Sequence, residues 1–174
     1  MTVSAVVTST TVDSGSELPD IPGFVLSVFS PLVNEAARRC LADPRVGEVA
    51  GPRTALLLGS VYGDSTTSDT ASRNLVAGDV RNPLLFYQSV PTTVLGNIAR
   101  DHGITGPTIS LSATGDPRHE LRETAELLFL TDEVDAALLI TVELAANPRT
   151  ARLSHTGDTD VATAVFLRKG ESTC

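Results

Sequence analysis

Four side chains that could do chemistry lie within eight residues of one another, and they are Ser112, Thr114, Asp116 and His119. A histidine can act as a general base, an aspartate can orient it, and a serine can act as a nucleophile. Asp116 followed by Pro117 is also a typical helix start, where free backbone N–H groups and the helix dipole favour an anion or a carbonyl oxygen. The pattern predicts either a site for acyl or anion chemistry, or a capped turn in which these groups have structural roles.

The segments around these residues alternate between strand and helix patterns. Residues 108–112 alternate β-branched and small side chains, as short strands do, and Gly115 with Pro117 ends this pattern. Residues 135–142, DAALLITV, form a continuous apolar run of strand length. A strand that is apolar on both faces belongs in a sheet that helices cover on both sides. In such folds ligands bind where a strand ends and a helix begins.

Similar signals extend along the rest of the chain. Strands are expected at 3–12, 53–61 and 161–167, and helices at 30–43, 69–77 and 90–101. Ser30 and Pro31 are expected to cap and open the first of these helices. Strands that alternate with helices predict a layered α/β sheet in one domain over residues 1–174. Its core is expected at about 24–169, with an opening strand and loop at 1–22 and a tail at 170–174.

Composition excludes several classes of protein. The 174 residues are 41% hydrophobic and 20% charged, and no apolar run approaches the roughly 20 residues that span a bilayer. The amino terminus lacks a basic segment followed by an apolar one, so we expect a cytoplasmic protein without a secretory signal. The net charge of −8 argues against nucleic-acid binding, which needs basic surfaces to neutralise phosphates.

The cysteines and histidines predict no metal site and no cofactor. Cys40 lies on the apolar stripe of its helix and is expected in the core, while Cys174 ends the chain, so no disulfide framework is predicted. His102 precedes Gly103 at a helix end, where it can interact with the last carbonyls. His155 lies in a polar loop and is expected at the surface. Three scattered histidines do not have the spacing of metal ligands.

Three stretches of the chain resemble the N-terminal half of β-ketoacyl synthases, which have the thiolase fold. Residues 54–63, TALLLGSVYG, are similar to the family's strand and loop TGLVLGSGYG. Residues 90–116 contain a helix, Gly-Pro and the strand GPTISLSATGD, similar to the family's nucleophile strand TVSTAC. Residues 161–167, VATAVFL, resemble its strand AAALVLER. The resemblance covers about residues 24–169 and implies an α/β/α fold with a five-stranded mixed, mostly parallel sheet, one half of a thiolase fold.

The resemblance also implies that the family's nucleophilic cysteine is absent. Counted from Gly106 and Pro107, its position falls on Gly115, and the family's two catalytic histidines lie in a C-terminal half that is not matched here. Condensation needs a thiolate to hold the acyl group and histidines for decarboxylation and oxyanion support. We therefore expect no cysteine-dependent condensing activity.

Two functional classes follow from the resemblance. The first is a non-elongating accessory protein, or pseudoenzyme, in polyketide or fatty-acid-type biosynthesis that binds acyl carrier protein or an active ketosynthase. The second is a repurposed enzyme that acts on a thioester or polyketide-derived substrate with Asp116, His119 or Ser112. A generic α/β binding protein is a third possibility. Thr114 and the basic Arg118 and Arg122 are candidate binding residues, the last two for an acidic carrier.

The helix after Gly115 carries an apolar stripe and a separate charged row, Arg118, Arg122 and Glu126. Burying that row without partners would cost several kcal/mol, so we expect it to face water or a polar partner surface. A missing C-terminal half is therefore not expected to dock on it as in the family. The resemblance further implies that the strand at 108–112 pairs with its mate across a twofold axis, in a homodimer or a heterodimer.

Overall fold

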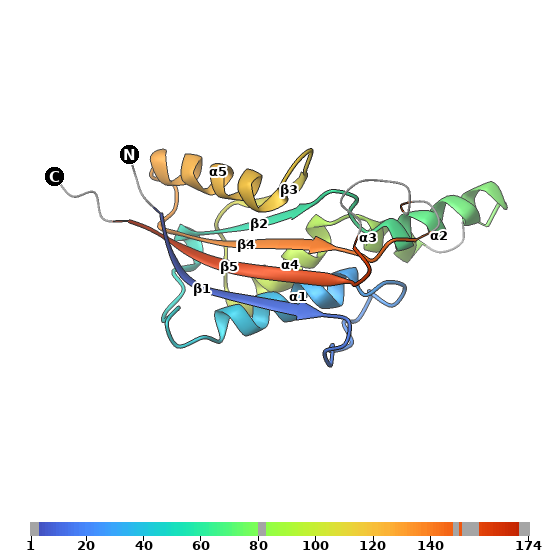
Figure 1. Cartoon of the computed structure of the whole chain (residues 1–174), viewed down its shortest axis with the longest axis horizontal. Coiled ribbons are helices and arrows are strands. Elements are labelled where there is room, and N and C mark those ends of the chain that lie inside the picture. Colours follow the sequence, from blue (N-terminus) through green and yellow to red (C-terminus); the bar gives the residue numbers. More distant parts are fainter. Residues whose placement is uncertain (1–3, 80–82, 148–149, 151–156, 171–174) are drawn as a thin grey trace.

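The computed structural model describes residues 4–79, 83–147, 150 and 157–170 (Figure 1). Along the chain, one or more helices separate the first four strands from one another. The elements are β1 Ser4–Asp13, α1 Phe29–Leu41, β2 Thr54–Ser60, α2 Ser65–Val76, α3 Pro83–Ser89, α4 Thr92–His102, β3 Thr108–Ser112, α5 Pro117–Leu130, β4 Ala136–Glu143 and β5 Val161–Lys169, with a short 3₁₀ turn at Gly51–Arg53. No helix in these ranges is long and apolar enough to cross a membrane.

The five strands form one mixed sheet in the order β1-β5-β4-β2-β3. β2 pairs parallel with both β3 and β4, whereas β5 pairs antiparallel with both β4 and β1. Four strands therefore point the same way and β5 runs against them, which confirms the expected mixed, mostly parallel sheet. β3 has the bounds predicted from sequence and lies at one edge of the sheet.

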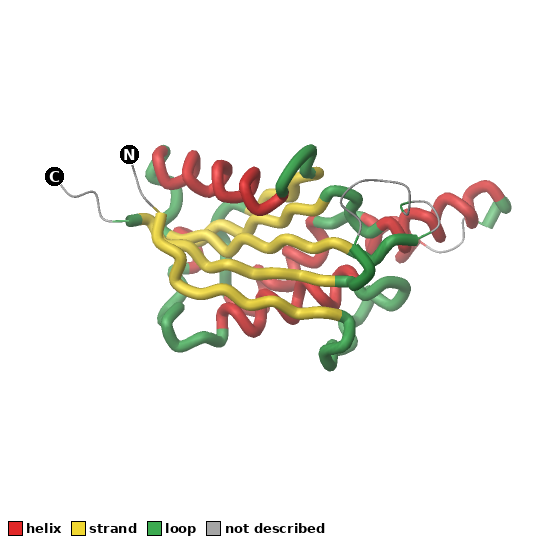
Figure 2. Tube along the Cα trace, viewed as in Figure 1, coloured by secondary structure: helices red, strands yellow, loops and turns green. Residues whose placement is uncertain are grey.

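Helices cover both faces of the sheet, in the α/β/α layering that the sequence predicts (Figure 2). α1 and α4 pack on one face, and α5 packs on the other, as two separate apolar clusters show. Cys40 is fully buried among the residues of the first cluster, which confirms its prediction as a core residue. On α5, Leu121, Ala125 and Phe129 are buried against the sheet, as the predicted stripe requires.

Two helix starts differ from the prediction. α1 begins at Phe29, so Ser30 lies buried inside its first turn and does not cap it. The Ser27 hydroxyl instead accepts the Phe29 N–H at 3.0 Å. α2 begins four residues before its predicted start, because the Asp64 carboxylate accepts the N–H and the hydroxyl of Thr67. Both helix starts are marked by local side-chain hydrogen bonds, which the spacing of apolar residues does not reveal.

Candidate functional site

The turn between β3 and α5 positions most of the predicted site residues. β3 ends at Ser112, and α5 begins at Pro117. Asp116 is the N-cap, and its carboxylate accepts the Arg118 N–H at 2.9 Å, as the Asp-Pro sequence predicts. The Asp116 carboxylate thus has a structural partner, and it stabilises the start of the helix.

The Glu120 carboxylate accepts hydrogen bonds from backbone N–H groups of this turn. Its Oε1 accepts the N–H of Gly115 at 2.8 Å, the N–H of Thr114 at 3.0 Å and the Thr114 hydroxyl at 3.3 Å. These are the backbone N–H groups around the position matched to the family's nucleophile. A negative charge from the chain itself therefore lies where an anion or a carbonyl oxygen would be expected. The sequence analysis predicted no role for Glu120, although acidic side chains are favoured in the first turns of helices, close to the free N–H groups.

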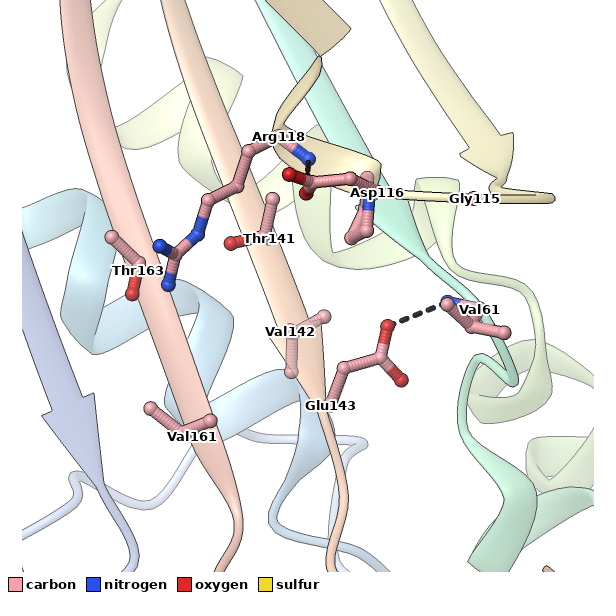
Figure 3. Close-up of a pocket in the computed structure, with 10 residues that line it drawn as sticks. Val61, Gly115, Asp116, Arg118, Thr141, Val142, Glu143, Val161 and Thr163 are labelled. Atoms are coloured by element: carbon pink, nitrogen blue, oxygen red, sulfur yellow. Dashed lines mark hydrogen bonds between the residues drawn. The ribbon is translucent and has the colours of Figure 1, made fainter. Parts of the chain in front are cut away.

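A cavity of about 310 Å³ opens beside this turn (Figure 3). The helix start contributes Gly115, Asp116 and Arg118 to its wall, and Val61 follows β2. Its other walls are Thr141 to Glu143 on β4, and Val161 and Thr163 on β5. Because β2 and β4 are parallel, the cavity lies at their carboxyl ends, where α/β sheets commonly bind ligands.

The cavity carries charges of opposite sign. The Glu143 carboxylate accepts the Val61 N–H at 2.6 Å and the Ser60 hydroxyl at 3.4 Å, which fixes it to the end of β2. The Arg118 side chain extends over Thr141 and Thr163 (Figure 3). The arrangement suits a small ligand that carries both a hydrogen-bond donor and an anionic or carbonyl group.

The structure separates Ser112 from the other two predicted catalytic residues, Asp116 and His119, which line the same groove. The His119 side chain is 70% exposed, and its Nε2 lies 3.3 Å from Glu123 Oε1, so it pairs along the helix surface. Asp116, which the sequence suggested as an orienting group, instead caps the helix. Ser112 lines a different hollow, of about 330 Å³, with Ser60 and residues of the β2–α2 loop. The geometry therefore shows no Ser112–His119–Asp116 triad.

The predicted binding residues Arg118 and Arg122 share a groove between α5 and the sheet. The groove has a volume of about 440 Å³ and is also lined by Asp116 and His119. Arg122 Nε lies 3.3 Å from Glu126 Oε1, and its guanidinium reaches Ser4 of β1 at 3.4 Å. Two members of the charged row predicted from sequence thus line this groove, and the third, Glu126, pairs with Arg122.

Cys40 and His102 are the remaining cysteine and histidine that the structure describes. Burial raises the pKa of the Cys40 thiol to about 11, so it is protonated at neutral pH. His102 is the last residue of α4, followed by Gly103 with φ of 65°, and burial lowers its pKa. Among the described residues, no group of His, Cys, Asp and Glu could hold a metal ion. His155 and Cys174 lie outside these residues.

The sequence and the fold were compared with those of known proteins, and solved structures with a similar fold were found. No family model and no curated protein matches the sequence. A ketosynthase in complex with its chain length factor from Xenorhabdus doucetiae has a TM-score of 0.72 at 20% identity, over 90% of this chain and 65% of that chain. A type II acyl carrier protein in complex with its ketosynthase gives 0.74 at 11% identity, over 95% and 63%. The chain has the thiolase-like fold of ketosynthases and chain length factors.

The ketosynthase-like fold confirms the resemblance that the sequence suggested. The ishigamide ketosynthase/chain length factor is a further similar structure, with a TM-score of 0.67 at 16% identity, over 95% of this chain and 55% of that chain. The chain thus spans less than two thirds of the length of each of these three chains. This span is consistent with one half of a ketosynthase.

Proposed function

We propose that this chain is a non-elongating, ketosynthase-like accessory protein in polyketide or fatty-acid-type biosynthesis, which binds an active ketosynthase or an acyl carrier protein in the cytoplasm. The fold supports this proposal, and so do the similar structures, which include a ketosynthase with its chain length factor and a carrier protein with its ketosynthase. The observation that carries it is the Glu120 carboxylate on the N–H groups of Thr114 and Gly115.

The physical reason lies in the charges that condensation creates. A thiolate nucleophile and the oxyanion of a tetrahedral intermediate are both negative, and backbone N–H groups stabilise such charges. Here Gly115 offers no nucleophile, and Glu120 both takes the N–H groups and adds a negative charge beside them. That arrangement disfavours elongation and leaves the turn as a scaffold.

Partner binding has two candidate surfaces. β3 is an edge strand, so its outer edge offers backbone groups to a strand of a second subunit, as the resemblance implies. Arg118 and Arg122 are exposed on α5 and suit an acidic carrier protein. We propose the first surface for a ketosynthase-type subunit and the second for a carrier.

A repurposed enzyme is the second candidate function. The open cavity between Arg118 and Glu143 favours it, because a pocket with opposite charges can orient a polar substrate. In this case the protein would act on a thioester or polyketide-derived substrate, with Asp116, which lines the cavity, or His119, which lines the neighbouring groove, as the candidate base.

Substrate conversion separates the two functions. The purified protein and its His119→Ala variant are incubated with acyl and β-ketoacyl thioesters on coenzyme A and on carrier protein, and the substrate masses are followed. Conversion by the wild type that disappears in the variant would establish the enzyme and overturn the accessory role. We expect unchanged masses from both proteins.

Binding is measured with a purified, cysteine-containing type II ketosynthase and with a carrier protein. A retained complex with either one supports the accessory function. Arg118→Glu with Arg122→Glu is expected to weaken carrier binding at least about tenfold through repulsion. Arg73→Glu with Arg100→Glu makes the same change in net charge on α2 and α4 and is expected to bind normally. Absence of both complexes contradicts the proposal.

A further inference from the structure

The cavity beside the start of α5 is lined by an arginine whose guanidinium has no acceptor among the described residues. The Arg118 side chain extends over Thr141 and Thr163 (Figure 3), and only its backbone N–H is hydrogen-bonded. Every other arginine that the structure describes donates its side chain to a carboxylate or a backbone carbonyl, as Arg122 does to Glu126. A guanidinium that lines a cavity in this way can bind the carboxylate of a ligand through two parallel hydrogen bonds.

A carboxylate lies farther along the same wall of the cavity. Glu143 follows Thr141 by two residues on β4, so both side chains project from one face of the strand, with their Cα atoms about 6.6 Å apart. The Val61 N–H donates to Glu143 Oε1 at 2.6 Å and holds this carboxylate at the end of β2. Arg118 makes no ion pair with it. The cavity therefore presents a positive and a negative group at separate positions.

The balance of charge indicates what kind of ligand fits. Asp116 also lines the cavity, so two carboxylates face one guanidinium. Both carboxylates would repel a ligand that is only anionic, whereas a ligand that is only cationic would leave the guanidinium unpaired. A ligand with a carboxylate and an ammonium group can satisfy both kinds of group. Glu143 can accept from it, because a carboxylate has more acceptor sites than the bonds to the end of β2 use.

The size and the apolar walls of the cavity limit the body of the ligand. Its volume of about 310 Å³ is at the lower end of the range, about 300–1,000 Å³, in which small-molecule pockets fall. Val61, Pro117 and Val161 contribute apolar side chains to its walls. The cavity therefore suits a compact molecule with a short aliphatic body.

We propose that this cavity binds a small aminocarboxylate, whose carboxylate pairs with Arg118 and whose ammonium group pairs with Glu143. The N–H groups of the turn take no part, since the Glu120 carboxylate already accepts those of Thr114 and Gly115. The inference concerns binding alone and requires neither the accessory function nor the enzymatic one, so its test is independent of any carrier, ketosynthase or thioester.

Isothermal titration calorimetry of the purified protein tests the ligand class. Glycine, β-alanine, 4-aminobutanoate and L-valine differ in the spacing of their two charges and in their aliphatic body. We expect at least one of them to bind with a Kd of about 1 mM or below. Removing either charge from the best ligand, as L-valinamide and 3-methylbutanoate do for valine, should weaken binding at least about tenfold. No binding of any of the four at about 10 mM overturns the proposal, and so does equal binding of an analogue that lacks one charge.

Substitutions test the placement of the ligand. Arg118→Gln and Glu143→Gln should each weaken binding at least about tenfold. Arg100→Gln also removes a positive charge, but on α4, and should bind as the wild type does. Circular dichroism shows whether each variant folds. Glu143→Gln keeps an acceptor for the Val61 N–H, and if it nevertheless fails to fold, Arg118→Gln decides, since its side chain has no acceptor to lose. Unchanged binding by folded Arg118→Gln overturns the proposal.

Discussion

Replacing Glu120 with alanine should destabilise the turn between β3 and α5. The substitution leaves the N–H groups of Thr114 and Gly115 without their carboxylate acceptor, and the bond to Gly115 is the partly buried one. A buried donor left unpaired costs about 1–3 kcal/mol, and an exposed one costs less because water replaces the lost partner. We expect a loss of about 1.5 kcal/mol, which lowers the melting temperature by roughly 3–6 °C in a chain of this size.

Urea denaturation followed by circular dichroism measures this loss as a lower midpoint at unchanged slope. Glu120→Gln keeps an acceptor oxygen and should cost about 0.5 kcal/mol. Glu123→Ala is the matched control, since its exposed carboxylate pairs with the exposed His119 and should contribute roughly 0–0.5 kcal/mol. If Glu120→Ala is no more destabilising than Glu123→Ala, the assignment of Glu120 as the acceptor of the turn is refuted.

Further predictions concern the reactivity of two thiols and the stability of the protein at acidic pH. Gly115→Cys should fold, because its Cβ would lie 3.6 Å from the Glu120 carboxylate, an ordinary contact. That carboxylate disfavours a thiolate, so iodoacetamide should label the new thiol several-fold faster when Glu120→Gln is added, and equal rates would contradict this. Hydrogen bonds from neighbouring arginines lower the Glu35 pKa to about 2, so its stabilisation is present above about pH 4.5 and is lost as the pH falls toward 2. Urea midpoints of Glu35→Gln between pH 5 and pH 2 should therefore fall less than those of the wild type. With Cys174→Ser in place, Cys40 should react with a disulfide reagent at pH 8 only after unfolding, and reaction in the native state would show that it is accessible.

Local patterns predicted the elements of the fold with good accuracy. The alternation at 108–112 matches β3, and Asp116 with Pro117 matches the start of α5. Cys40 is buried because its apolar stripe faces the sheet. These features depend on contacts within one turn of helix or on the two faces of one strand, so neighbouring residues suffice to specify them.

The chemistry of the site depends on longer-range geometry. Ser112 and His119 are close in sequence, yet the turn sends Ser112 toward the β2–α2 loop and leaves His119 on the helix surface. The cavity joins the start of α5 to Glu143, on a strand that follows α5 in the chain, and only strand order places them together.

Residue types alone thus established an α/β fold, a buried Cys40 and a capped helix after Gly115, because propensity, capping and apolar spacing act locally. The tertiary structure decided that Glu120 fills the N–H groups of that turn and that α1 and α4 pack on one face of the sheet while α5 packs on the other. Both depend on the direction in which the chain leaves β3 and on the number of helices packed on each face. Such relations arise from the packing of whole elements, which no short stretch of sequence encodes.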